Sequence, residues 1–163
     1  TDNFYGAPFI WSYIGDFGGN THYLVPLNLI STRSSASLPV ENCLGVGSTL
    51  EGLNINPISY DLLLEQPWHN PPKVNLDDWV TAYATRRAER PDPAVLKAYD
   101  ILNKNIFIDN PDGLWGRKIV LQSSPSYKPG EPAKSTFPIK QNFLTAAVGK
   151  LLEAVSASRK AGG

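Results

Sequence analysis

The stretch Leu44-Gly-Val-Gly-Ser-Thr-Leu-Glu51-Gly52 places one carboxylate in a glycine-flanked turn directly after a short apolar run. Glycine lets the backbone take positive φ angles or approach a ligand closely, at an entropic cost that a purely structural loop has less reason to carry. Just beyond it, Asn56-Pro57 is typical of a helix N-cap followed by proline at the first helical position. The sequence therefore predicts a strand over 43–46, a turn carrying Glu51, and a helix over 57–64.

Motifs on both sides of this stretch give the carboxylate a context. They are Gly6-Ala-Pro-Phe-Ile-Trp11, Asp16-Phe-Gly-Gly-Asn20, Gly47-Ser-Thr-Leu-Glu-Gly52, and Tyr60 nine residues after Glu51. In order and spacing they resemble the α-N-acetylglucosaminidases of glycoside hydrolase family 89, whose pattern is Pro-Phe-Ile-Trp, Asn-Phe-Gly-Gly-Asn and Gly-Thr-Gly-Met-Ala-Pro-Glu-Gly. The likeness continues through Asp77-Asp-Trp-Val80 and Ala84-Thr-Arg-Arg87, so it covers residues 4 to about 106.

Three positions depart from the family pattern. Asp16 stands where the family usually has Asn, Leu50 where it can have Pro, and Pro57 where some members carry an acidic residue. None of these departures removes Glu51, so the resemblance still implies a glycosidase.

The resemblance implies a (β/α)₈ barrel followed by a large helical domain, and a closed eight-stranded barrel needs about 250 residues. A chain of 163 residues that begins at Thr1 and contains no Met is therefore expected to be an internal piece of a longer precursor. We expect an α/β part followed by an all-α part. Residues 1–66 would form the last βα units of the barrel, and residues 67–163 the start of the C-terminal helical domain.

The expected elements follow from local patterns. Residues 8–14 predict a buried parallel strand, residues 18–22 a βα loop, and residues 23–30 a short helix interrupted or bent at Pro26. Proline-rich residues 66–72 indicate a boundary, because three prolines in seven residues cannot continue a helix.

Three amphipathic helices are expected after that boundary. Asn75 and Asp92 are predicted N-caps for helices over 76–84 and 93–106, and the third helix spans 144–155. Residues 107–136, rich in Pro, Gly and Ser, predict a long irregular connection between the second helix and the third.

By the resemblance, Glu51 is the nucleophile of a retaining glycosidase. It would attack the anomeric carbon, and a second carboxyl about 5–5.5 Å away would act as acid and then as base. The family's acid/base Glu lies upstream of Thr1. Asp16 is a local substitute for that acid, although a supporting polar role in the pocket is favoured for it.

Four further residues are candidates for substrate contact. Trp11 and Phe17 could form an apolar wall against a sugar ring, Asn20 could hydrogen-bond hydroxyls or the acetamido group, and Tyr60 could hold Glu51 from the following helix. Packing in the core is the alternative role for Trp11, Phe17 and Tyr60. For Trp11 and Tyr60, substrate contact and core packing are equally favoured.

Composition excludes several classes of function. Fifteen basic residues balance fifteen acidic ones and are scattered except at Arg86-Arg87, which argues against a nucleic-acid partner. Those two arginines could complement the C-terminal turn of a helix, or one of them could pair with a carboxylate across the domain boundary.

Apolar runs are shorter than the ~18 residues that a membrane span requires. The single cysteine, Cys43, is interpreted as a small buried residue.

No metal is expected, because His22 and His69 lack a third ligand at metal spacing, and the resemblance implies no cofactor. We therefore predict a part of a retaining exo-α-N-acetylglucosaminidase that acts on terminal α-linked N-acetylglucosamine in glycans such as a heparan-sulfate-like polysaccharide. Its partners would be that glycan and the rest of the same enzyme, and its location secreted, lysosomal or vacuolar.

Two other interpretations remain open at this point. One is a non-catalytic fragment that binds sugar or another subunit. The other is an unrelated helical interaction module over residues 73–163, which would fold alone.

Overall fold

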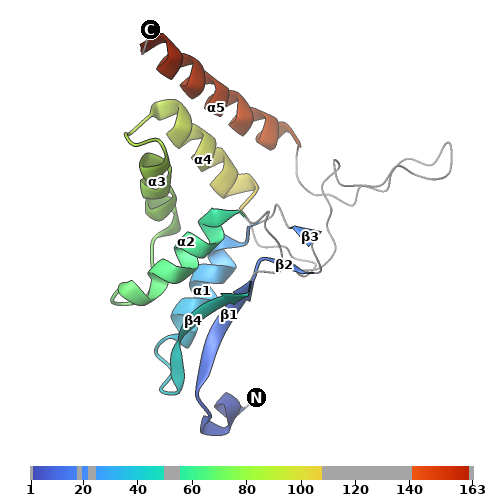
Figure 1. Cartoon of the computed structure of the whole chain (residues 1–163), viewed down its shortest axis with the longest axis vertical. Helices are drawn as coiled ribbons and strands as arrows, with labels where there is room; N and C mark the ends of the chain where they lie inside the picture. Colours follow the sequence, from blue (N-terminus) through green and yellow to red (C-terminus); the bar gives the residue numbers. More distant parts are fainter. Residues whose placement is uncertain (1, 18–19, 22–24, 50–55, 108–140, 162–163) are drawn as a thin grey trace, which may run out of the picture.

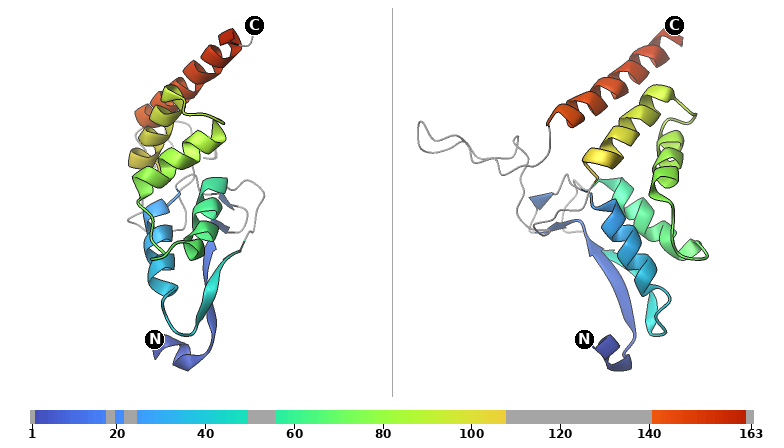
Figure 2. Two further views of the ribbon diagram at one scale, coloured as in Figure 1. Left: turned by 90° about the vertical axis from the view of Figure 1, so that its left-hand side faces the viewer. Right: turned by 180° about the vertical axis from the view of Figure 1, so that it is seen from behind.

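The computed structural model describes residues 2–17, 20–21, 25–49, 56–107 and 141–161 (Figure 1). A short 3₁₀ helix η1 (Asp2–Gly6) opens the chain and leads into a small sheet. Two helices lie on one side of this sheet, and three more continue away from it, so that the N-terminus and the last helix lie at opposite ends of the molecule (Figures 1 and 2). The expected α/β part followed by helices is confirmed at this level.

Strands β1 (Phe9–Ile14) and β4 (Cys43–Thr49) pair in parallel. Parallel neighbours need a crossover connection, and here it contains helix α1 (Leu27–Ser37). A register shift next to Phe9 brings Ile10 opposite Gly45, and Gly45 takes a φ of +149° that only glycine adopts readily. The pairing then runs regularly to Ile14 opposite Thr49.

The strand predicted over 43–46 was too short, because β4 continues through Gly47 and Ser48 to Thr49. Gly45 permits the irregular register, and Gly47 fits against β1, where a Cβ atom would come within 3.2 Å of Ile10 Cγ2. Both glycines therefore serve strand pairing. Cys43 is a free cysteine of intermediate exposure rather than a fully buried one.

The helix predicted over 23–30 was also wrong in its bounds, because α1 begins after Pro26 and runs on to Ser37. Pro26 has no N–H to continue a helix behind it, but its carbonyl accepts from Ile30 N at 2.9 Å. The buried face of this helix includes serines, so the sequence shows no continuous apolar pattern there. Buried Ser34 satisfies its hydroxyl by donating to Ile30 O at 2.7 Å.

Helix α2 (Pro57–Glu65) begins as predicted, with the Asn56 side chain accepting from Ile58 N at 3.2 Å. It ends in a 3₁₀ turn, η2 (Gln66–Trp68), and residues 69–75 contain no helix, as the prolines predict. The segment of 107–136 predicted to be irregular lies outside the described residues from 108 onwards.

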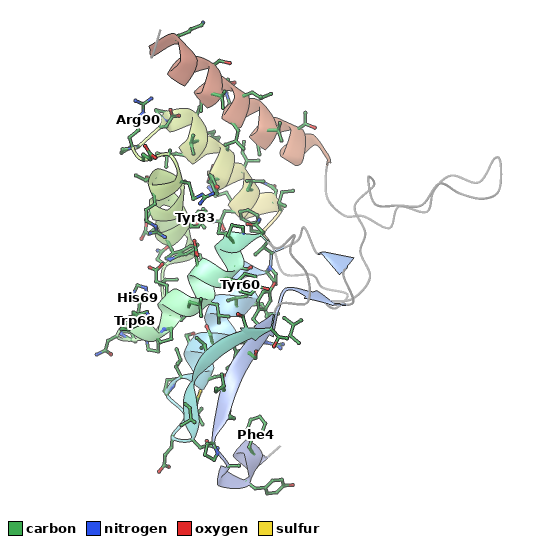
Figure 3. The ribbon with its side chains drawn as sticks, in the orientation of Figure 1. Phe4, Tyr60, Trp68, His69, Tyr83 and Arg90 are labelled. Atoms are coloured by element: carbon green, nitrogen blue, oxygen red, sulfur yellow. The ribbon has the colours of Figure 1, made fainter. Side chains whose placement is uncertain are left out.

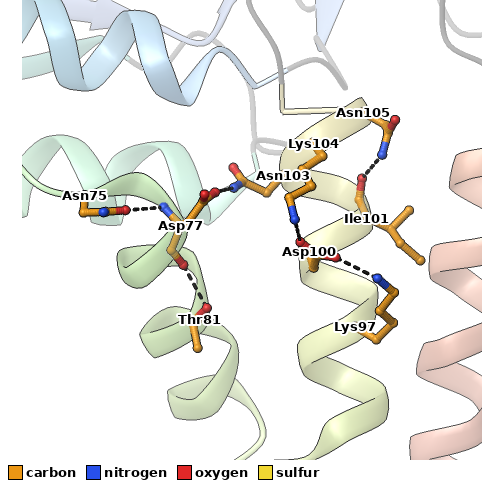
Figure 4. Close-up of polar contacts among 9 residues, drawn as sticks. All are labelled: Asn75, Asp77, Thr81, Lys97, Asp100, Ile101, Asn103, Lys104 and Asn105. Atoms are coloured by element: carbon orange, nitrogen blue, oxygen red, sulfur yellow. Dashed lines mark hydrogen bonds and ion pairs between the residues drawn. The ribbon is translucent and has the colours of Figure 1, made fainter.

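Helices α3 (Leu76–Arg87), α4 (Pro93–Asn105) and α5 (Gln141–Ala161) confirm the three predicted amphipathic segments, and α5 is longer than expected at both ends. Figure 4 shows how α3 and α4 are joined: Asn103 Nδ2 donates to Asp77 Oδ1 at 2.7 Å. On α4, Asp100 pairs with Lys97 at 2.8 Å and with Lys104, and these hydrogen bonds lower the pKa of Asp100.

One hydrophobic cluster crosses the expected boundary at residue 66. It contains residues of β1, α1, α2 and α3, one residue before α1 and the two residues that follow α4: Tyr13, Val25, Leu27, Ile30, Ile58, Leu62, Leu63, Trp79, Val80, Tyr83, Ile106 and Phe107. Residues of α3 and the two residues after α4 therefore share one core with β1, α1 and α2. This argues against an independent helical module.

The opposite face of the sheet is open. Ile10 and Ile14 of β1 and Leu44 of β4 are exposed, by 58%, 37% and 72%. Helix α5 buries Ala147 and Ala154, next to α4, and exposes Val148, Leu152 and Val155. Parallel strands are normally covered on both faces. The chain therefore presents apolar surface on the sheet and on its last helix.

Candidate active site

The carboxyl ends of β1 and β4 lie side by side, because Ile14 pairs with Thr49. Functional groups of β/α barrels gather at this edge. Glu51 follows Thr49 by two positions in the sequence and lies outside the described residues, so its role as nucleophile stays a prediction. What the structure establishes is the end of the strand that precedes it.

A short antiparallel pair follows β1 at the same edge. Strand β2 (Asp16–Phe17) pairs with β3 (Asn20–Thr21), and Phe17 lies directly opposite Asn20. The loop predicted over 18–22 thus includes the second strand of this pair, Asn20–Thr21. The backbone brings two predicted substrate-contacting residues next to each other, although the side chains of Asp16, Phe17 and Asn20 lie outside the description.

Trp11 lies in the middle of β1, on the face that carries the helices. It is half-buried and packs against the hydrophobic core, as does its register partner Val46. Alternation along β1 leaves Ile10 and Ser12 exposed on the other face. This position agrees with the alternative in which Trp11 packs in the core instead of contacting a sugar.

Tyr60 lies in the first turn of α2, with its ring 5.9 Å from the ring of Tyr13 and tilted by 56°. Its hydroxyl is buried and reaches the end of β1, where it lies 2.5 Å from the point that a Cβ atom on Gly15 would occupy. Figure 3 shows Tyr60 beside the ends of the strands. The structure therefore brings Tyr60 to the edge that precedes Glu51.

A second cluster of charged and aromatic groups lies at the other end of α2. Glu65 accepts from Trp79 Nε1 at 2.9 Å, and its carboxylate lies 3.7 Å from Arg86 Nη2 and 3.4 Å from His69 Nε2. The Arg86 guanidinium also lies 5.8 Å from the ring centres of Trp79 and Tyr83. The sequence left two roles open for Arg86 and Arg87. Arg86 has the second of them, because it contacts a carboxylate, that of Glu65, across the expected boundary.

This cluster lies away from the carboxyl ends of the strands, because α2 starts at that edge with Asn56 and ends at Glu65. Sequence reasoning did not find Glu65 or the role of Trp79. The only signal was an acidic residue placed immediately before the proline-rich segment. In β/α barrels this opposite end contributes to stability rather than to catalysis.

Two tyrosines at the α3–α4 contact are electrostatically perturbed. Burial raises the pKa of Tyr83 above its ordinary value of 10.0, and neighbouring Tyr99 raises it further. Burial likewise raises the pKa of Tyr99, while the charge of Arg87 works against the rise. Their rings contact edge to face at 5.7 Å. Both groups are therefore suited to packing as neutral phenols.

Within the described residues, no group of three or more His, Cys, Asp or Glu side chains is arranged to hold a metal ion. His69 Nε2 lies 3.4 Å from Glu65 Oε1, and His22 lies outside the description. Among the helices of the same part of the chain, none is both long enough and apolar enough to cross a bilayer.

The first half of the chain has the parallel βαβα arrangement of an α/β fold, the kind of unit that is repeated in β/α barrels. Residues 1–70 match the family described as the TIM-barrel domain of α-N-acetylglucosaminidase. Through this segment the chain is recognised as a partial match to the α-N-acetylglucosaminidase family, glycoside hydrolase family 89.

A curated relative and several solved structures agree with this assignment. Human α-N-acetylglucosaminidase is 31% identical over 109 residues, which are 66% of this chain and 15% of the human protein. The Clostridium perfringens family 89 glycoside hydrolase is similar in structure at 21% identity. Its complex with PUGNAc gives a TM-score of 0.81 over 97% of this chain, and its complex with GlcNAc-α-1,4-galactose gives 0.78 over 93%. This chain spans 18% of that bacterial protein.

Proposed function

We propose that this chain is the part of a retaining exo-α-N-acetylglucosaminidase that carries the nucleophile, Glu51. The observation that carries the proposal is the parallel pairing of β1 with β4 up to Thr49, within the segment that matches the family's barrel domain. A residue two positions beyond a barrel strand is in the region from which such enzymes draw their catalytic groups.

The reaction would proceed in two steps. The Glu51 carboxylate attacks the anomeric carbon and forms a glycosyl ester, while a second carboxylic acid protonates the departing glycosidic oxygen. That second group, now a carboxylate, then removes a proton from water, which opens the ester with net retention. The Clostridium perfringens enzyme is described with its substrate in a variant that has two glutamates replaced by glutamine. This description supports a pair of glutamates.

Other residues would support this chemistry from the same edge. Phe17 would contact the apolar face of the sugar, and Asn20, directly opposite it in the β2–β3 pair, would hydrogen-bond hydroxyls or the acetamido group. Tyr60 would support Glu51 from the first turn of α2. Trp11 would contribute by packing, because it faces the core.

The second carboxyl and the leaving-group subsites would come from the rest of the enzyme, which is the chain's proposed partner. We place the last barrel units in residues 1–66 and the start of the helical domain in residues 67–163. Terminal α-linked N-acetylglucosamine is the proposed substrate group, in glycans such as a heparan-sulfate-like polysaccharide. The family resemblance favours a secreted, lysosomal or vacuolar location.

The test is Glu51→Gln in the full-length protein, assayed with an aryl α-N-acetylglucosaminide. The amide has nearly the same shape but cannot supply the attacking charge, so most of kcat should be lost while KM and the melting temperature change little. Glu153→Gln on the exposed face of α5 is the matched control and should keep full activity. Retention of more than about a tenth of kcat, a loss of only ~1.4 kcal/mol, would rule out Glu51 as the nucleophile and turn attention to Asp16.

A further inference from the structure

The face of the sheet that points away from α1 and α2 carries side chains of both strands in register. A Cβ atom on Gly47 would lie 3.2 Å from Ile10 Cγ2 and 3.9 Å from Ser12 Oγ, so Gly47 shares this face with those two residues. Because side chains alternate along a strand, Ile14 continues the face on β1 and Thr49 continues it on β4. Ile14 and Thr49 are register partners, and both are exposed. They form the last level of this face at the carboxyl edge.

That level decides what Ile14 and Thr49 meet in a barrel. Helices cover the outside of a β/α barrel, so the face without helices is the inner one, and substrates bind where the strands end at the carboxyl edge. Ile10 lies deeper, opposite Gly45, at a level where side chains fill the barrel interior. In the proposed barrel, Ile14 and Thr49 are therefore part of the floor of the substrate pocket.

The two side chains of this level differ in chemistry. Ile14 offers a branched hydrocarbon that is 37% exposed, and Thr49 offers a hydroxyl that can donate and accept hydrogen bonds. The proposed substrate group, N-acetylglucosamine, carries hydroxyls around its ring and one acetamido group, in which a methyl adjoins an amide. Among these substituents, only the acetamido group presents an apolar end next to a hydrogen-bonding part. An isoleucine beside a threonine is complementary to that combination.

We propose that Ile14 and Thr49 recognise the acetamido group of the terminal sugar: Ile14 contacts its methyl group, and the Thr49 hydroxyl donates a hydrogen bond to its carbonyl oxygen. The inference rests on the proposed hydrolysis of α-linked N-acetylglucosamine and holds whichever carboxylate is the nucleophile. Both residues determine specificity for the acyl group and take no part in bond cleavage. A floor fitted to a methyl group excludes longer acyl chains.

The test of Ile14 measures kcat/KM of the full-length protein on two aryl α-glucosaminides, whose nitrogen carries an acetyl or a propionyl group. Wild type should prefer the acetyl sugar about tenfold, the effect of one added methylene in a fitted apolar pocket. Ile14→Ala makes room for the methylene and should remove most of this preference. Ile10→Ala is the matched control on the same face of the same strand and should leave the preference unchanged.

The test of Thr49 uses the same two substrates. Thr49→Val keeps the shape and removes the hydroxyl, so kcat/KM on both sugars should fall about fivefold, in the range of a neutral hydrogen bond. The preference between the sugars should stay, because both carry the same amide. Thr49→Ser keeps the hydroxyl and should retain most of the activity. Ser48→Ala is the control, since Ser48 pairs with Tyr13 at the neighbouring position and should not affect either sugar.

Several results would overturn the proposal. They are a wild type that accepts both acyl groups equally, a preference unchanged in Ile14→Ala or equally reduced in Ile10→Ala, and a Thr49→Val variant as active as wild type. If Ile14→Ala does not fold, Ile14→Val removes a single methylene and carries the same test, with a smaller loss of preference expected and an unchanged preference again contradicting the proposal.

The proposed function fails in a different way. Wild-type protein that hydrolyses neither sugar would refute the proposed glycosidase activity itself. An active wild type whose preference and rate are the same in the Ile14 and Thr49 variants would refute only the inference about these two residues.

Discussion

The indole Nε1 of Trp79 donates a hydrogen bond to Glu65 Oε2 at 2.9 Å, which joins the last residue of α2 to the first turns of α3. Trp79 is 5% exposed, so its N–H needs a partner inside the protein. Arg86 lies on the other side of the same carboxylate and over the Trp79 ring. One carboxylate at the end of α2 therefore contacts two side chains of α3.

We expect Glu65→Ala to lower the free energy of unfolding by about 1–2 kcal/mol, because it leaves the Trp79 N–H buried without its acceptor. Glu65→Gln keeps an oxygen for Trp79 and loses only the charge facing Arg86, whose side chain is 53% exposed, so it should cost less than about 1 kcal/mol. Denaturant unfolding of the two variants measures the difference. Equal losses would assign the stability to the Arg86 ion pair instead.

The two helix N-caps after the boundary, Asn75 and Asp92, should stabilise the folded protein by similar amounts. Asn75 Oδ1 accepts from the N–H groups of Asp77 and Asp78, and Asp92 Oδ1 accepts from those of Ala94 and Val95. Replacing either cap by Ala should cost about 1 kcal/mol of stability, measured by thermal unfolding. Asp92→Asn keeps the acceptor and is the control. A loss as large as that of Asp92→Ala would contradict the capping role.

Alkaline pH should destabilise the α3–α4 contact through its tyrosines. Because the folded-state pKa values of Tyr83 and Tyr99 are raised, their contribution to stability is complete below the ordinary value of 10.0 and is lost as pH rises through the raised values. Tyr99→Phe should flatten the fall of stability above pH 10. Unfolding curves across that range test this, and identical slopes in wild type and variant would contradict it.

Chemical rescue should identify the nucleophile independently. In Glu51→Ala, azide could occupy the vacated space and attack the anomeric carbon of a substrate with a good leaving group, giving the β-glycosyl azide from an α-linked donor. Product analysis by NMR would detect it. A loop carboxylate offers no such route. If azide restored hydrolysis without forming the glycosyl azide, the result would contradict a role of Glu51 as the attacking nucleophile.

The local signals in the sequence predicted the helical half well. Asn56, Asn75 and Asp92 begin their helices where the cap-plus-helix pattern places them, because capping depends only on residues two or three positions away. The proline-rich boundary is equally local. Helix α1 and strand β4, which precede Asn56, were harder to predict, since Gly47 is suited to β4 only through Ile10 of another strand, and α1 buries serine rather than a continuous apolar face.

Of the candidate site, the structure locates Tyr60, while Glu51 stays a prediction. Motif spacing placed Tyr60 near Glu51, and the structure places Tyr60 beside the end of β1. The need for glycine at position 15 depends on a tyrosine 45 positions away in sequence, which no spacing rule reveals. Glu65 was missed for the same reason: its partners Trp79 and Arg86 come from a helix beyond the boundary.

Ile106 and Phe107 belong to the same buried cluster as Leu27 and Ile30. On the ribosome, β1, α1, β4 and α2 therefore emerge well before the residues that finish covering them. Until Phe107 has left the exit tunnel, the early segments hold an incomplete core with apolar surface that a chaperone can bind. A stop codon or proteolytic cut shortly before Ile106 would accordingly damage the barrel half as much as the helical half, although the change lies far from it in sequence.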